Sequence, residues 1–236
     1  MLLGVNIDHI ATLRNARGGQ DPNLLDAAEI CKKLKVNGIT IHLREDRRHI
    51  KDADLEALRN IENLRINLEM AATQEMKEIA LKYLPEACCI VPEKRAELTT
   101  EGGLDVASQV ENITNLVSAL KNAGIVVSLF IDADEKQIQA SAQSGAQYIE
   151  LHTGQYANAF GTEKEEIEFQ RLKKAAFLAK KLGLKVNAGH GLNYDNVHRM
   201  HEIPELEELN IGHSIIARSI YVGFEKAVSE MDNLIK

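Results

Sequence analysis

No stretch of the sequence approaches the roughly 18 consecutive apolar residues that a membrane-spanning helix needs. The first ten residues, MLLGVNIDHI, lack both the basic segment and the small-residue cleavage site of a secretory signal. These two absences exclude the usual routes to and through a membrane. We therefore expect no membrane partner and a protein that stays in the cytoplasm.

Cysteine and positive charge are also in short supply. The chain has three cysteines, and two of them, Cys88 and Cys89, are adjacent, so that on an extended strand they point to opposite faces. A paired framework of disulfides is therefore excluded, and we expect three buried apolar thiols. The formal net charge of −7 argues against a general affinity for nucleic acid, whose phosphates need clustered positive charge.

What the chain does have is the length and apolar content for one large core, with 236 residues of which 44% are hydrophobic. We expect a single domain over residues 1–236. Short segments rich in β-forming residues recur along its whole length. They predict eight strands, at residues 2–8, 38–43, 64–70, 87–93, 126–132, 147–153, 185–191 and 208–214.

Helical segments with recognisable boundaries lie between these strands. We expect Asp21-Pro22 to open the first helix, and Thr162 with Glu165 fits a capping box at the start of another. Glycine is expected just past the end of three further helices, at Gly124, Gly145 and Gly183.

Strands and helices that alternate in this way predict parallel strands joined by right-handed crossovers. Eight such units in 236 residues match a closed (β/α)8 barrel, the TIM barrel of the α/β class, with additional short helices. An open, doubly wound sheet is the alternative. It is disfavoured because no glycine-rich dinucleotide fingerprint follows the first predicted strand.

Polar and ionisable residues gather at the carboxyl ends of the predicted strands. In a barrel these ends converge on one mouth, where active sites are built. An unpaired charged group in a barrel interior is costly, so this concentration favours catalysis over stability as its reason. Several of the residues are spaced by two and would face the same side of their strand. The set is Asn6, Asp8, His9, His42, Arg44, Asn67, Glu69, Glu93, Asp132, Glu150, His152, Asn187, His190 and His213.

Two glycine-containing segments predict an anion site. Gly189–Gly191 follows the seventh strand, and Ile211–Ser214 follows the eighth and leads directly into a helix. Glycine lets backbone N–H groups approach an anion, and a helix N-terminus adds a favourable partial charge. Tight turns alone would use the same glycines, but the position after strands seven and eight favours phosphate.

A second anion site is predicted after the second strand, where Arg44 and His49 offer donors to phosphate. We expect the other charged residues of that loop to form solvated ion pairs, namely Glu45, Asp46, Arg47 and Arg48. The sequence at 94–104 has two interpretations, a lid that brings Thr99 or Thr100 to a phosphate and an ordinary surface loop.

Nine blocks spread over nearly the whole chain carry a family resemblance: GVNIDHIATLRNARG, HLREDRRHI, NLEM, VPEKR, TTEGGLDV, SLFIDAD, IELHTG, VNAGHGLNY and ELNIGHSIIAR. Each short block is a weak signal alone, but the full set in this order is specific. The chain resembles the pyridoxine 5'-phosphate synthase family. The resemblance implies condensation of 3-amino-2-oxopropyl phosphate with 1-deoxy-D-xylulose 5-phosphate, with release of phosphate and water. It also implies a homo-octamer with no metal and no organic cofactor.

The resemblance further implies roles for particular residues, and every implied position is present in this chain. His42 and Glu69 are implied as proton acceptors, His190 as proton donor and Glu150 as the residue that stabilises a transition state. The residues implied to bind the amino-ketone phosphate are Asn6, Arg17, Gly191, Gly212 and His213. Those implied to bind the deoxyxylulose phosphate are Asp8, His9, Arg44, His49 and Thr99.

Three other functions stay open on the residues alone. A Schiff-base aldolase needs an inward lysine, and only Lys94 lies near a predicted strand end. A non-catalytic sensor of sugar phosphates would keep the anion sites but would not need the acid and base groups. A divalent-metal enzyme would draw its ligands from His42, Glu69, Glu150, His152 and His190.

Overall fold

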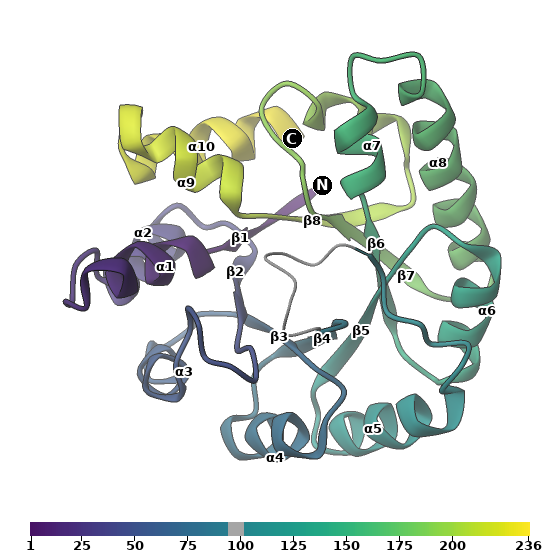
Figure 1. The fold of residues 1–236 in the computed structure, drawn as a ribbon, viewed down its shortest axis with the longest axis horizontal. Coiled ribbons are helices and arrows are strands. Elements are labelled where there is room, and N and C mark those ends of the chain that lie inside the picture. The colour runs from purple at the N-terminus through teal and green to yellow at the C-terminus, as the bar shows by residue number, and fades with distance from the viewer. Residues whose placement is uncertain (94–101) are drawn as a thin grey trace.

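Eight parallel strands form a closed barrel in sequence order, surrounded by helices (Figure 1). The structure is a computed structural model, and it describes residues 1–93 and 102–236. The first strand pairs with both the second and the eighth, which confirms the predicted TIM barrel and rules out the open sheet. The strands are β1 (Leu2–Asn6), β2 (Gly38–His42), β3 (Ile66–Met70), β4 (Ala87–Ile90), β5 (Val126–Ile131), β6 (Tyr148–His152), β7 (Lys185–Gly189) and β8 (Leu206–Ile211).

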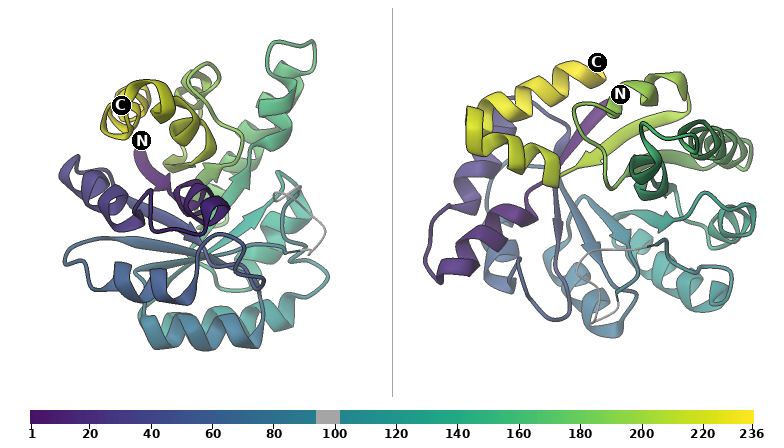
Figure 2. Two further views of the ribbon diagram at one scale, coloured as in Figure 1. Left: turned by 60° about the vertical axis from the view of Figure 1, so that its left-hand side comes forward. Right: turned by 45° about the horizontal axis from the view of Figure 1, so that its top comes forward.

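The helices lie outside the strands in all views (Figures 1 and 2). Within the part of the chain that the structure describes, no helix combines the length and apolar character needed to cross a membrane. The described helices are α1 (Asp8–Arg17), α2 (Leu24–Lys33), α3 (Asp52–Arg59), α4 (Gln74–Tyr83), α5 (Val110–Asn122), α6 (Glu135–Gln143), α7 (Gly154–Ala159), α8 (Glu165–Lys181), the 3-10 helix η1 (Val197–Glu202), α9 (His213–Val222) and α10 (Phe224–Ile235).

The apolar core lies between the strands and the helices, and the interior of the barrel is partly polar. Leu3 and Val5 of β1 are fully buried in the main hydrophobic cluster. Gly4, between them, belongs to the other face of the strand. A side chain at Gly4 would overlap the Asn210 and Glu208 side chains, so glycine there makes room for buried polar groups inside the barrel. The three cysteines are buried free thiols, as predicted.

Two predicted helix starts are wrong. Asp21-Pro22 does not open the first helix, because β1 already ends at Asn6 and α1 follows at once from Asp8. The next helix, α2, is capped instead by Asn23, whose side chain accepts a hydrogen bond from the Leu25 N–H at 2.9 Å. The early start of α1 places Asp8 in the first helical turn above the barrel mouth and not on the strand.

The capping box predicted at Thr162 and Glu165 is also wrong in its pairing. The Thr162 hydroxyl accepts from the Lys164 N–H at 3.2 Å, and the Glu165 carboxylate accepts from the Gly161 N–H at 2.8 Å. The predicted helix ends are confirmed by left-handed glycines just past the last turns of α5, α6 and α8, with φ of 83°, 79° and 84° at Gly124, Gly145 and Gly183.

Candidate active site

Two carboxylic acid side chains lie inside the barrel near its mouth, Glu69 on β3 and Glu150 on β6. Glu150 is 2% exposed, and its Oε2 accepts a hydrogen bond from Asn210 Nδ2 at 2.6 Å. Asn210 Oδ1 in turn accepts from the Thr40 hydroxyl at 2.8 Å. Asn210 is thereby held with its amide toward Glu150, so the Glu150 side chain has a fixed position across the barrel.

Both carboxyl groups have raised pKa values. Burial raises the pKa of Glu69 well above its usual value, and the negative charges of Glu150 and Asp8 raise it further. Burial raises the pKa of Glu150 to about 7, although the hydrogen bond from Asn210 works in the opposite direction. A carboxyl group with a pKa near neutrality can give and take protons under physiological conditions, as acid/base catalysis requires.

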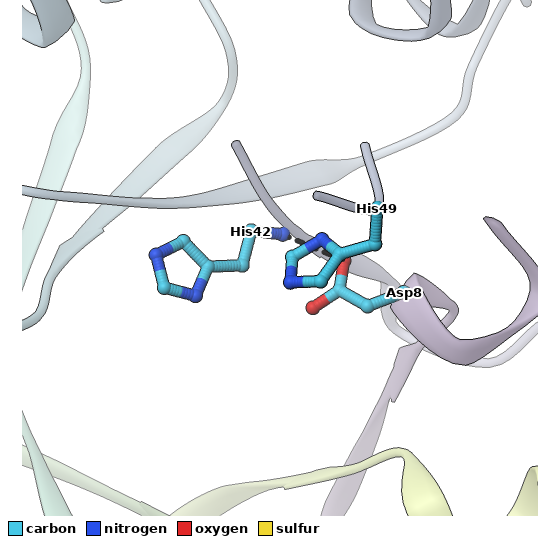
Figure 3. Close-up of side chains that lie close together, drawn as sticks. All are labelled: Asp8, His42 and His49. Carbon is cyan, nitrogen blue, oxygen red and sulfur yellow. Dashed lines mark hydrogen bonds and ion pairs between the residues drawn. The ribbon is translucent and has the colours of Figure 1, made fainter. Parts of the chain in front are cut away.

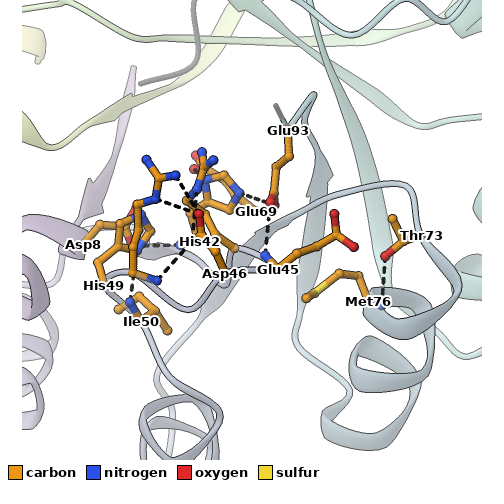
Figure 4. A network of polar contacts seen from close by, with 12 residues as sticks. Asp8, His42, Glu45, Asp46, His49, Ile50, Glu69, Thr73, Met76 and Glu93 are labelled. Carbon is orange, nitrogen blue, oxygen red and sulfur yellow. Dashed lines mark hydrogen bonds and ion pairs between the residues drawn. The ribbon is translucent and has the colours of Figure 1, made fainter. Parts of the chain in front are cut away.

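His42, at the end of β2, lies beside Glu69 in the sheet register and contacts two carboxyl groups (Figure 4). Its Nδ1 is 3.9 Å from Glu69 Oε2, and its Nε2 is 2.8 Å from Glu93 Oε1. The His42 backbone N–H donates to Asp8 Oδ1 at 2.8 Å. These contacts hold the imidazole between β3 and the segment that follows β4.

Asp8, His42 and His49 form a compact group on one side of the mouth (Figure 3). Among the described residues, this is the group of His, Cys, Asp and Glu side chains whose potential ligand atoms all lie within 4.8 Å of one another. It is not the set that the metal-enzyme hypothesis uses, of which it shares only His42. Burial lowers the pKa of His49, which favours the neutral ring.

The loop after β7 places His190 and Gly191 at the opposite side of the mouth. Both have left-handed backbones, with φ of 82° and 78°. This conformation is uncommon outside glycine, although histidine adopts it more readily than most residues. The Thr153 hydroxyl lies 2.7 Å from the Gly189 carbonyl oxygen and 2.6 Å from that of His190, and so anchors the turn.

The His190 ring lies among other histidines. It meets the His152 ring edge to face at a centroid distance of 5.1 Å, and His152 Nδ1 lies 2.9 Å from Asp132 Oδ1. Burial lowers the pKa of His190 to about 4, and the positive charges of His152 and His9 act in the same direction. The free protein therefore holds His190 neutral at physiological pH.

The start of α9 lies next to this loop and has the geometry of an anion site. Gly212 precedes the helix, and a side chain there would overlap Asn6 at 2.8 Å, so the backbone of β8 passes very close to β1. The Ser214 hydroxyl donates to the Leu192 carbonyl at 2.8 Å and links the loops after β7 and β8. The first N–H groups of α9 have no partner within the helix and can bind phosphate.

Most of the predicted site residues come together at this mouth. His9 and His213 meet edge to face at 5.2 Å, and Asn6 Nδ2 donates to Asp8 Oδ2 at 2.9 Å. Arg44 is 4% exposed, with its Nε 3.6 Å from Asp46. The structure thus gathers both of the predicted anion-binding regions around Glu69 and Glu150.

Among the described residues, Arg17 is predicted for the site but is not brought into this group. Arg17 ends α1 and is exposed, nine residues beyond Asp8, which corresponds to about 14 Å along a helix. Thr99 and the alternative Thr100 lie outside the described residues, as does Lys94 of the aldolase hypothesis. The ion pairs predicted for the loop after β2 are confirmed for Asp46, Arg47 and Arg48, with Arg47 on Asp52 and Arg48 on Asp46 at 2.8 and 2.6 Å. Glu45 forms no ion pair within the described part of the chain.

Asn210 and Thr40 are site residues that the sequence reasoning missed. Their spacing could have revealed them. Asn210 precedes Gly212 by two residues and Thr40 precedes His42 by two, so each lies on the same side of its strand as a predicted site residue. A groove of about 620 Å³ lies elsewhere, between α6 and α8 on the outside of the barrel. It contains none of the residues predicted for the site.

Comparisons with known proteins identify the family of the chain. The family model described as "Pyridoxal phosphate biosynthesis protein PdxJ" matches residues 3–236. The chain is 56% identical to a pyridoxine 5'-phosphate synthase of Idiomarina loihiensis over 233 residues, covering 99% of this chain and 96% of that protein. It is also 56% identical to one of Geobacter sp. over 234 residues, covering 99% and 98%.

Solved structures with the same fold are more distant in sequence. A 3-hexulose-6-phosphate synthase superimposes with a TM-score of 0.66 at 14% identity over the whole of both chains. KGPDC from Streptococcus mutans gives 0.64 at 15% identity, covering 99% of this chain and 98% of that chain. These two likenesses concern the barrel alone, whereas the family model and the 56% identical relatives span both the barrel and its mouth. The chain belongs to the PdxJ family of pyridoxal phosphate biosynthesis proteins.

Proposed function

We propose that the protein is a pyridoxine 5'-phosphate synthase. It condenses 3-amino-2-oxopropyl phosphate with 1-deoxy-D-xylulose 5-phosphate and closes the pyridine ring, releasing phosphate and water. The observation that carries the proposal is the pair of inward carboxyl groups, the half-buried Glu69 and the buried Glu150, whose raised pKa values support proton donors and acceptors at a mouth with two anion-binding regions. Membership of the PdxJ family supports it.

Ring closure of this kind needs several proton transfers, because an amine joins a ketone, phosphate departs and water is lost. We assign His42 and Glu69 as proton acceptors and His190 as the donor. Glu150, whose pKa is about 7, stabilises a charged transition state. This division is supported by the positions of the groups, since His42 adjoins Glu69 and His190 adjoins the loop glycine Gly191.

The two substrates would take opposite sides of the mouth. The loops after β7 and β8 face the amino-ketone phosphate, with Asn6, Gly191, Gly212 and His213 as its ligands. Arg17, which the family resemblance adds to this set, would have to reach the phosphate from the exposed end of α1. The side that carries β2 and its loop faces the deoxyxylulose phosphate, with Asp8, His9, Arg44, His49 and Thr99 as its ligands. The left-handed Gly191 and the N-terminus of α9 support the first assignment, and the buried guanidinium of Arg44 supports the second.

We propose one catalytic domain over residues 1–236, acting in the cytoplasm as a homo-octamer without metal or organic cofactor. Exposed apolar side chains support self-association. At the end of α9, Ile220 is 73% exposed and Tyr221 is 88% exposed, and Leu13 on the neighbouring α1 is 55% exposed. Large apolar groups left on a surface are typical of protein contacts.

The test is to mix the purified, chelator-treated protein with both phosphorylated substrates and to follow pyridoxine 5'-phosphate by absorbance and mass. We expect product at the same rate before and after chelation, because the proposed chemistry uses only protein acids and bases. The matched control repeats the reaction with one substrate omitted.

Each rival function predicts a different result in that experiment. Product that appears only after a divalent metal is restored would favour the metal enzyme. Binding of both substrates without product would favour the sensor. A substrate adduct trapped by borohydride would favour the aldolase.

A further inference from the structure

We propose that Glu93 is a positioning residue that fixes the tautomer of His42, so that His42 Nδ1 can take the proton of Glu69. The proposal rests on the acid/base function proposed above. It adds a third carboxyl group to the site and names the nitrogen that acts as base.

Both carboxylate oxygens of Glu93 have partners, which fixes the side chain (Figure 4). Glu93 follows β4, and its side chain is 5% exposed. Oε1 lies 2.8 Å from His42 Nε2, and Oε2 accepts from the Glu45 N–H at 3.1 Å. A carboxyl group engaged on both oxygens has one orientation, and it holds the imidazole in one plane.

The charge of Glu93 decides where the His42 proton lies. Burial alone raises the pKa of Glu93, but the hydrogen bond and charge of His42 and the Glu45 N–H together lower it below its usual value. Glu93 is therefore a carboxylate, which can only accept hydrogen bonds. The neutral His42 ring must then carry its proton on Nε2, which leaves the lone pair on Nδ1.

That lone pair faces the acid that has to be activated. His42 Nδ1 lies 3.9 Å from Glu69 Oε2, and the raised pKa of Glu69 means that it rests as a carboxylic acid. Glu69 must lose this proton before it can act as a base. In the step, the Glu69 O–H bond breaks and an Nδ1–H bond forms on His42, giving a carboxylate and an imidazolium beside the unchanged Glu93 carboxylate. The gap closes to hydrogen-bond distance when substrate fills the mouth, as is common for catalytic contacts.

Among the described residues, no carboxylate other than Glu93 is placed to fix the tautomer of the His42 ring. Asp8 accepts from the His42 backbone N–H and not from the ring. Glu150 acts on Glu69 through its charge and is held by Asn210. The centroids of the His49 and His42 rings are 5.8 Å apart, which is too far for a hydrogen bond between the rings to compete with Glu93.

Glu93→Gln tests the proposal because an amide cannot satisfy both contacts in the same way. Its oxygen is needed by the Glu45 N–H, so its NH₂ group faces His42 Nε2 and forces the ring proton onto Nδ1. The matched control is Glu45→Gln, which makes the same change on an exposed side chain of the loop after β2 and keeps the backbone N–H that Glu93 accepts from.

The readouts are the nitrogen chemical shifts of the His42 ring by NMR and the separate values of kcat and KM. We expect the wild type and the control to carry the Nε2–H tautomer. We expect Glu93→Gln to carry Nδ1–H, with kcat lower by about 10- to 100-fold, as for other residues that orient a functional histidine. KM for both substrates should stay within about threefold of the wild-type values, because Glu93 contacts neither substrate in the proposed arrangement. A tautomer change without loss of kcat would contradict the catalytic use of Nδ1.

If NMR finds His42 of the wild-type protein in the Nδ1–H tautomer, the proposal is overturned. This measurement needs no variant, so it tests the proposal even if Glu93→Gln does not fold. A Glu93→Gln enzyme as fast as Glu45→Gln also overturns it. Failure of the proposed function looks different, because the wild type itself would then form no pyridoxine 5'-phosphate.

Discussion

Replacing Glu69 by glutamine is expected to lower kcat by about 10²- to 10⁴-fold while both substrates still bind. Glutamine has nearly the same shape as the protonated carboxyl group that the raised pKa implies for the resting protein, so the fold and the mouth should be preserved. The glutamine amide, however, cannot release a proton and act as a base. The loss should therefore fall on kcat and not on KM.

The measurement is steady-state kinetics together with calorimetric titration of each substrate. Glu62→Gln serves as the control, since Glu62 is exposed just before the opposite end of β3 and has no part in the site. Equal losses in binding and in turnover would contradict the role of Glu69 as a base and would favour a structural role.

Replacing His190 by asparagine is expected to lower kcat by about 10²- to 10⁴-fold as well, for loss of the proton donor. Asparagine is the right substitute because it tolerates the left-handed backbone at this position better than other side chains. The variant also tests how a histidine whose pKa is lowered to about 4 comes to donate a proton.

Free His190 is neutral above about pH 4, and a phosphate dianion next to it raises its pKa, so substrate binding at pH 6 takes up a proton. Titration in buffers of different ionisation enthalpy measures this uptake. We expect wild type and the exposed control His198→Asn to take up more protons than His190→Asn; identical uptake in all three would show that His190 stays neutral in the complex.

The barrel could be predicted because each strand and helix leaves a local pattern. The alternation of apolar segments with helical ones fixes a parallel sheet, and polar residues at strand ends predict the mouth. The start of α1 could not be found in this way. Asn6, Ile7 and Asp8 continue the pattern of β1, and the contacts that Asp8 makes with Asn6 and with the His42 backbone N–H exist only in the folded barrel.

The contacts across the barrel were beyond the sequence for a different reason. Asn210 on β8 contacts Glu150 on β6 and Thr40 on β2. These strands are far apart in the chain, and the contacts depend on the stagger of the whole sheet. The same holds for His42 at the end of β2 and Glu93 after β4, because β3 lies between these two strands in the barrel. Arg17 was predicted from resemblance alone, and its exposed place at the end of α1 depends on the full length of that helix.

A crystal structure with pyridoxine 5'-phosphate bound tests most directly whether this mouth is where the ring is closed. The account predicts the product inside the barrel mouth, with its ring between Glu69 and Glu150 and its phosphate on backbone N–H groups of the loops after β7 and β8 or beside Arg44. Product found instead in the groove between α6 and α8, with the mouth empty, would contradict the assignment of the active site.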